Sequence, residues 1–255
     1  GAIDGEIIIN PNAEQREVSE MAVTVASTKN VEQIKDELGV GFTVHAPILD
    51  IHLGSTNQHV RAAAFQEMEA SIDFARQIGA SLVVIHPAPG IMCMPAGTWS
   101  KKNYHGTARE NEVLEQQEAY MVRAVKDLAD SCPDLLLGLE NLVFPHEQYR
   151  SPEELQELLR KVNRTNVGLT LDVGHGVVCG HQPSDFINLL GDAIFHVHLH
   201  DNNGVIDQHL PLGEGIIDYV AVIQSLKQLD YLGVVTLEFM LADPADYRDF
   251  VHQFA

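Results

Sequence analysis

The sequence predicts a single α/β domain of the (β/α)8-barrel class, built on a parallel sheet. Short apolar segments alternate with longer amphipathic segments along the whole chain, which is the pattern of parallel α/β folds. The 255 residues, 45% of them hydrophobic, can bury the core of one barrel, although the length would also fit two smaller domains. No linker or low-complexity segment divides the chain, so we expect residues 1–255 to form one domain.

Seven apolar runs are predicted as strands. They lie at residues 6–10, 42–47, 82–87, 135–141, 167–175, 193–201 and 234–240. Most are nearly continuous rather than alternating, which is typical of parallel strands covered on both faces.

Helices are predicted between these strands, where apolar residues recur every three or four positions. They lie at residues 31–38, 60–78 and 110–129, in a segment that starts at Ser151, and at 219–229 and 247–254. The start at Ser151 combines an N-cap serine, Pro152 in the first turn and two glutamates near the positive end of the helix dipole.

The strand count leaves the closure of the barrel open, because a TIM barrel has eight strands and seven are predicted. The first residues, "GAIDGEIII", resemble the end of a helix, a turn and a strand. Either a preceding strand and helix are missing from this chain, or the barrel closes in another way.

Composition excludes some classes of partner. Thirty-six acidic and 16 basic residues give a formal net charge of -20, so we expect neither nucleic acid nor an acidic membrane surface as a partner. Bound divalent cations would offset part of this charge. The three cysteines (Cys93, Cys132 and Cys179) form no Cys-x-x-Cys pair, and with no signal peptide or membrane span in the sequence we expect reduced thiols in a cytoplasmic protein.

Metal-capable side chains stand at or near the carboxyl ends of six predicted strands. They are His45, His86, Glu140, Asp172 with His175, His198, and Glu238. In a parallel barrel these ends meet on one face, which holds the active site. Carboxylates gathered there need a cation to offset their repulsion, so the pattern predicts a metal site. Mixed histidine and carboxylate ligands suit Zn²⁺, Mn²⁺, Co²⁺ or Fe²⁺ better than Ca²⁺.

The stretch "FHVHLHDNNGVIDQHLPLGEG", residues 195–215, is the densest part of this pattern. His196, His198 and His200 share one face of the predicted strand because side chains alternate along a strand. We expect His198 to face the metal, His196 to lie deeper as a structural residue, and His200 to lie at the mouth and contact substrate. Asp207 and His209 follow in a loop that can reach back over the site.

These motifs resemble a known superfamily. "GLEN" at 138–141, "LDVGH" at 171–175, "HVHLHD" at 196–201, "DQHLPLGEG" at 207–215 and "TLEF" at 236–239 are similar to the xylose isomerase-like TIM-barrel superfamily. That group includes sugar phosphate isomerases and epimerases, ketose 3-epimerases and endonuclease IV. The resemblance extends over nearly the whole chain and is more specific for the superfamily than for a reaction.

The resemblance implies two sets of metal ligands. The metal shared by the epimerases and the nuclease would be held by Glu140, Asp172, His198 and Glu238. The further positions that let the nuclease hold three zinc ions match His45, His86, His175, Asp207 and His209. We therefore expect one to three divalent ions, of Zn, Mn or Co.

Other segments depart from the nuclease. At the positions of two nuclease motifs this chain has "ENLVFPH" and "HLHDNN". No residue of this chain is recognisable as the arginine that the nuclease wedges into DNA. Leu49 does match the leucine that the nuclease inserts.

Three functions follow. The first is a metal-dependent isomerase or epimerase of a sugar or sugar phosphate, in which Glu140 and Glu238 exchange protons next to a carbonyl. The second is an endonuclease IV-like zinc phosphodiesterase acting on abasic DNA. The third is a metal-stabilised barrel that binds a sugar without transforming it. The oligomeric state stays open.

A long segment after His86, "PAPGIMCMPAGTWSKKNYHGTA", has neither helical nor strand periodicity. Its cluster of basic and aromatic residues includes Trp99, Lys101 and Lys102. Two interpretations stay open: a lid over the site whose lysines bind an anionic substrate group, and a solvated surface loop.

Overall fold

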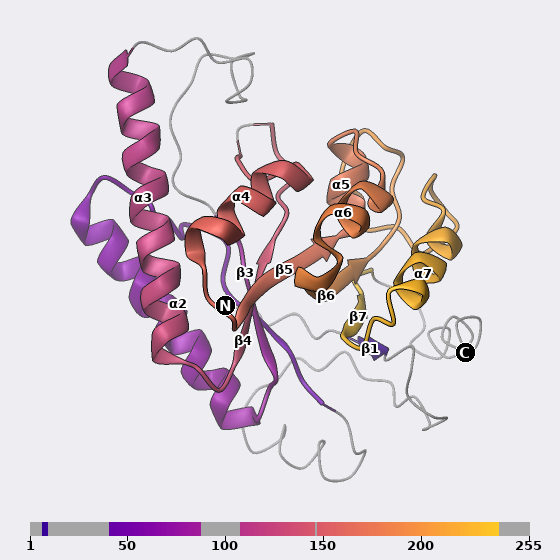
Figure 1. Ribbon diagram of the computed structural model, residues 1–255, viewed down its shortest axis with the longest axis horizontal. Coiled ribbons are helices and arrows are strands. Elements are labelled where there is room, and N and C mark those ends of the chain that lie inside the picture. The colour runs from indigo at the N-terminus through magenta and orange to yellow at the C-terminus, as the bar shows by residue number, and fades with distance from the viewer. Residues whose placement is uncertain (1–6, 10–40, 88–107, 146, 240–255) are drawn as a thin grey trace.

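The computed structural model of the protein describes residues 7–9, 41–87, 108–145 and 147–239. It consists of a curled sheet with helices along its outer side (Figure 1). The elements are β1 (Ile7–Ile9), β2 (Val44–His45), α2 (Gln58–Ile78), β3 (Leu82–Ile85), α3 (Ala108–Ser131), β4 (Leu136–Glu140), α4 (Pro152–Val162), β5 (Val167–Asp172), α5 (Val173–Val178), α6 (Pro183–Leu190), η1 (Gly191–Ala193), β6 (Ile194–Leu199), α7 (Tyr219–Gln228) and β7 (Val234–Leu237).

The sheet follows the order β1-β7-β6-β5-β4-β3-β2, with β1 and β2 at its edges. Strands β2 to β7 pair in parallel, each with its neighbour in sequence. The expectation of a wholly parallel sheet is wrong for β1, which pairs with β7 in the antiparallel direction. An apolar run such as "III" does not encode strand direction, because both ladder types use the same backbone groups.

The helices cover the outer side of the sheet in chain order (Figure 1). Contacts join α2 to α3, α3 to α4, α4 to α6 and α6 to α7. In α2 the buried side chains include Met68, Ile72 and Ala75, spaced by three or four residues, which places them on one face of the helix. These faces pack on strands such as β3 and β5, whose residues are all buried.

The helix ends follow the signals in the sequence. The hydroxyl of Ser151 accepts the backbone N–H of Glu154 at 3.3 Å, and Pro152 begins α4 as predicted. Two short helices, α5 and α6, were not predicted. At α6 a signal was present: Pro183 stands in the first turn, and Gln182 and Asp185 form a capping box. The helices predicted at 31–38 and 247–254 lie outside the described residues.

The core lies between the sheet and the helices, and its largest buried side chains include Phe186, Met121 and Leu155. Cys132 and Cys179 are free thiols. Among the described helices, none combines the length and the apolar character needed to cross a bilayer.

Candidate metal centre

The parallel strands bring the predicted ligands to one end of the sheet. Strands β2, β4 and β5 end at His45, Glu140 and Asp172, whereas His86 and Glu238 immediately follow β3 and β7. Within β6, His198 stands directly opposite Asp172 in the register. Residues far apart in sequence therefore meet in three groups, each with side-chain atoms close enough to share an ion.

The first group consists of His45, His86 and Glu140. Oε2 of Glu140 lies 3.2 Å from Nε2 of His45 and 3.0 Å from Nε2 of His86. Both imidazoles are partly exposed, whereas the carboxylate is 1% exposed. The group is therefore open to solvent on its histidine side.

The second group consists of Glu140, Asp172, His198 and Glu238. Nδ1 of His198 lies 3.3 Å from Oε1 of Glu140, 3.1 Å from Oε2 of Glu238 and 3.9 Å from Oδ2 of Asp172. Glu140 belongs to both groups, with one oxygen facing each. Three carboxylates thus surround one imidazole in a largely buried site, and Glu238 is the member that reaches solvent, at 26% exposed.

The third group consists of His175, His200, Asp207 and His209. The carboxylate of Asp207 lies 3.3 Å from Nε2 of His175 and 2.9 Å from Nε2 of His209. The expectation that His175 lies on the fifth strand is wrong. The chain turns into α5 at Val173, because the carboxylate of Asp172 caps this helix by accepting the N–H of His175 at 2.6 Å.

The histidine orientations fit metal ligation. Nδ1 of His45, His175 and His209 lies 2.8, 2.8 and 2.7 Å from the backbone carbonyls of Ala46, Asn141 and Glu238. A carbonyl only accepts, so Nδ1 carries a proton, and Nε2 is the nitrogen that faces the group and offers a lone pair once it is deprotonated. This is the orientation that metal-ligating histidines show in proteins.

The charges in the site also fit a cation. Glu140, Asp172, Asp207 and Glu238 gather here, and within the described residues their ion pairs are all with histidines. Burial alone would raise the pKa of Glu140, but the attraction of His198 and His86 holds it well below its usual value. Donors of this kind, imidazole nitrogen with carboxylate oxygen, suit Zn²⁺, Mn²⁺ or Co²⁺.

The histidines show the opposite shift. Burial lowers the pKa of His198 and His175, yet Glu238 and Asp172 respectively outweigh it and bring both well above the usual value. Burial also lowers the pKa of His209, but its hydrogen bond with Asp207 raises it to about 9. Without a metal, protons on these rings take the place of the cation.

Asp201 holds the loop that carries Asp207 and His209, a role the sequence analysis missed. Its buried carboxylate accepts the backbone N–H groups of Asn202, Gly213, Gly215 and Ile217 at 2.9–3.0 Å. The loop is closed by mutual backbone hydrogen bonds of 2.8 Å between Asp201 and Leu210. The signal in the sequence was an aspartate ending a strand before the glycines of "LGEG".

His209 adopts a left-handed backbone conformation, with φ 48°. This conformation costs a non-glycine residue about 1–2 kcal/mol. Its ring is held from both sides, by Asp207 and by the carbonyl of Glu238. The strain therefore places the imidazole in the third group.

Two histidines flank His198, namely His196 within β6 and His200 just after its end, and both are completely buried. His196 lies 3.0 Å through Nε2 from the hydroxyl of Thr236, and none of the three groups includes it. His200 was expected at the mouth, but the structure places it beneath the loop, beside Asp172 and His209. Parity along the strand gave the correct face and could not give the depth. The predicted lid residues Trp99, Lys101 and Lys102 lie outside the described residues.

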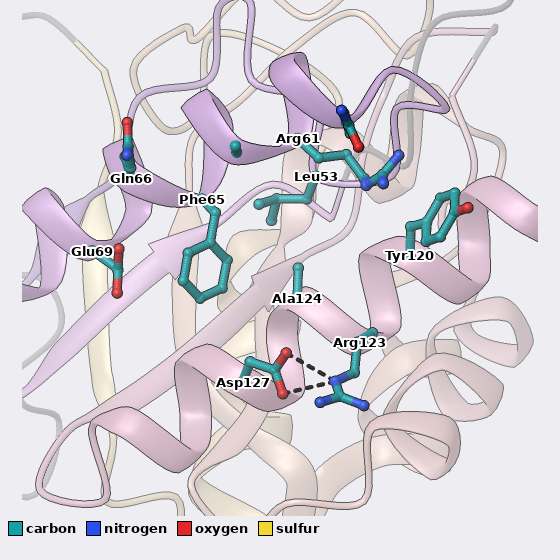
Figure 2. Close-up of a pocket in the computed structure, with 11 residues that line it drawn as sticks. Leu53, Arg61, Phe65, Gln66, Glu69, Tyr120, Arg123, Ala124 and Asp127 are labelled. Carbon is teal, nitrogen blue, oxygen red and sulfur yellow. Dashed lines mark hydrogen bonds and ion pairs between the residues drawn. The ribbon is translucent and has the colours of Figure 1, made fainter.

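A separate surface groove of about 430 Å³ lies between α2 and α3. Figure 2 shows its lining, with Phe65 and Ala124 facing each other and Arg123 paired with Asp127. The guanidinium of Arg61 stands 3.8 Å from the centre of the Tyr120 ring. The groove shares no residue with the three metal-capable groups.

Comparisons with known proteins agree with the fold. The model of the xylose isomerase-like TIM barrel family matches residues 7–249. An uncharacterized protein of Methanocaldococcus jannaschii is 32% identical over 225 residues, which are 83% of this chain and 70% of that protein. A probable endonuclease 4 of Mycobacterium ulcerans is 26% identical over 195 residues, or 73% and 69% of the two chains.

A solved structure described as a D-tagatose 3-epimerase-like protein is 28% identical and has a TM-score of 0.73. The match covers 89% of this chain and 81% of that one. Together with the family match, it confirms the predicted (β/α)8-barrel class.

Proposed function

The chain belongs to the xylose isomerase-like TIM barrel family, and on this premise we propose that it is a divalent-metal-dependent isomerase or epimerase of a sugar or sugar phosphate. The observation that carries the proposal is the second group, in which Glu140 and Glu238 flank Nδ1 of His198. These carboxylates come from non-adjacent strands, so they can reach a substrate from different sides. The epimerase-like neighbour at 28% identity supports the same class of reaction.

The reaction requires a proton to leave a carbon next to a carbonyl and another to arrive. A divalent ion held by Glu140, Asp172, His198 and Glu238 would polarise that carbonyl. Glu238 reaches solvent and can take the proton. Glu140, from the opposite side of the group, can deliver one to the other face of the carbon if it enters the step protonated, and the proton on Glu238 then returns to solvent or serves the reverse reaction. In an isomerase the proton would return to the neighbouring carbon instead.

The decisive experiment follows proton exchange in D₂O. The metal-loaded protein is incubated with D-tagatose, D-fructose, D-allulose and their phosphates, and NMR detects deuterium at the carbon beside the carbonyl. We expect exchange with at least one of these sugars. Glu238→Gln and Glu140→Gln should each lower the rate by at least about 100-fold, since general acid–base groups contribute about 10²–10⁴.

Glu112→Gln is the matched control, because Glu112 is exposed on α3, and it should keep the full rate. Full exchange in folded Glu238→Gln would refute the assignment of roles. Sugar binding without any exchange in the wild type would favour a non-catalytic sugar-binding protein.

The third group supports a second candidate function, that of a zinc-dependent phosphodiesterase. An endonuclease IV-like phosphodiesterase needs three clustered ions, and all nine side chains that the resemblance assigns to them lie in the three groups. The probable endonuclease 4 relative, at 26% identity, points the same way.

A further inference from the structure

His200 faces the same point in space as the other members of the third group. Its Nε2 lies 3.6 Å from Oδ1 of Asp207, and the candidate ligand atoms of all four residues lie within 4.8 Å of one another. Its ring stacks on that of His209, with centres 4.0 Å apart and planes 12° apart. The imidazole is completely buried, so it meets the group and not the solvent.

The other ring nitrogen of His200 follows the pattern of the neighbouring ligands. Nδ1 lies 3.5 Å from the carbonyl of Asp201, as Nδ1 of His175 and His209 lies near a backbone carbonyl. Donation to a carbonyl leaves Nε2 as the nitrogen that faces the centre of the group and that can ligate an ion once it is deprotonated. The three imidazoles of this group are therefore presented in the same way.

The chain also makes room for this ring. A Cβ atom at residue 174 would overlap Cε1, Nε2 and Nδ1 of His200, so the ring occupies the space that the absent side chain of Gly174 leaves. Gly174 lies between Asp172 and His175 in the "LDVGH" motif. Asp172, His175 and His200 thus pack together around Gly174.

We propose that His200 is a direct ligand of the third metal ion, which completes a closed site with His175, Asp207 and His209. The inference rests on the proposed function for the presence of metal. Four protein ligands fill the tetrahedral shell of zinc, and sites of this kind are structural, whereas catalytic zinc keeps a position open for water. An ion held by these four side chains would fix the loop that carries Asp207 and His209, and no ligand position would stay open for a water, unlike in the three-residue site that the resemblance implies.

A different role for His200 is the alternative that the test must separate. Nε2 lies 3.2 Å from both oxygens of Asp172, so the ring could serve only to orient that carboxylate. His200→Asn separates the two roles, because an amide can still donate a hydrogen bond toward Asp172 but supplies no nitrogen ligand.

The experiment measures zinc and cobalt binding to the chelator-treated full chain, with competition by a chromophoric chelator. We expect three zinc equivalents in the wild type. His200→Asn and His200→Ala should weaken one of them by more than about 100-fold, since loss of an outer hydrogen bond alone costs about 10–100-fold. The visible absorption of the cobalt protein should fall in both variants, because water replaces a protein ligand.

Two matched variants complete the design. Gly174→Ala should displace the ring and weaken the same equivalent, whereas Gly41→Ala, where an added Cβ would meet nothing within 4 Å, should not. His45→Asn removes a ligand of the first group and should leave the third-site cobalt signal unchanged. Circular dichroism verifies that each variant is folded.

Wild-type zinc affinity and cobalt spectrum in His200→Asn would overturn the inference, as would a wild type that binds no ion at the third group. A wild type that exchanges sugar protons with one ion per chain would refute the inference and leave the proposed function intact. If the wild type binds three ions, one of them dependent on His200, but turns over no sugar, the inference stands and the proposed function is refuted.

Discussion

At the scale of single residues, protons would compete with the proposed metal ions for the same imidazoles. The pKa of His175 and of His198 lies well above the usual value, and that of His209 is about 9. A protonated imidazole cannot ligate a metal. The pH of the solution therefore sets both the stability of the metal-free protein and its affinity for the ion.

We predict that the difference in melting temperature between zinc-loaded and chelator-treated protein widens from pH 6.5 to pH 9. In the metal-free protein, protonated His209 is stabilised by Asp207. Because its pKa is raised on folding, this contribution is complete below about pH 6.5 and is lost as the pH rises through about 9. Zinc binding changes in the opposite direction, since fewer protons oppose it.

Differential scanning fluorimetry across this range measures the effect. In His209→Asn the widening should be smaller, because one of the titrating rings is gone. A difference that stays constant or narrows with pH would contradict the prediction.

At the scale of elements, the loop between β6 and α7 depends on one buried carboxylate. We predict that Asp201→Asn destabilises the zinc-saturated protein by about 2 kcal/mol. Oδ2 of Asp201 accepts the partly buried N–H groups of both Gly213 and Gly215, and an amide nitrogen in its place accepts neither. A donor left unpaired costs about 1–3 kcal/mol when buried, and partial exposure keeps the expected loss toward the lower end of that range. Urea unfolding measures the free energy of unfolding. Loss of these hydrogen bonds should also loosen the third metal-capable group, since Asp207 and His209 belong to this loop.

Asp218→Asn provides the matched control at the end of the same loop. Asp218 caps α7 by accepting the N–H of Ala221 at 3.0 Å, and asparagine is an equally good N-cap. Its free energy of unfolding should stay within about 0.5 kcal/mol of the wild type. Equal effects of the two substitutions would show that Asp201 is not a special support.

The elements that the sequence predicted well are those with a strong local pattern. The β-branched run "LVVI" favours the strand β3, and the long apolar stripe of α2 favours a helix. Helix α5 has six residues, too few to show a helical period, and its first residues continue the apolar run that predicts a strand at 167–175. The direction of β1 depends on a partner strand more than 200 residues away in sequence, so no local pattern could reveal it.

In the site, too, some residues follow from a sequence pattern and others depend on contacts between segments that are distant in sequence. Glu140, Asp172 and His198 could be placed together because parallel strands end on one face, a rule that needs no coordinates. The supporting roles of Asp201 and Asn141 do not follow from the strand pattern, because each side chain holds backbone groups that are distant in sequence. Asn141 exchanges two 2.8 Å hydrogen bonds with the backbone of Asp172, which joins the ends of β4 and β5.

At the scale of the whole molecule, the net charge of -20 bears on the nuclease alternative. We predict no incision of duplex DNA containing an abasic site at physiological salt, because an acidic protein is repelled by the phosphate backbone. Gel electrophoresis of a labelled duplex, with zinc-saturated protein, measures it. Glu238→Gln prepared in the same way identifies a contaminating nuclease. Zinc-dependent incision by the wild type that this variant lacks would establish the phosphodiesterase function instead.

The contact between Gly174 and His200 has an evolutionary consequence. Because a side chain at 174 would occupy the volume of the imidazole, neither position can change its size freely while the other stays fixed. Lineages within the family should therefore divide into those with glycine and histidine at the two positions and those with a larger and a smaller residue. This covariation would distinguish descendants with a sealed third site from those with an accessible one.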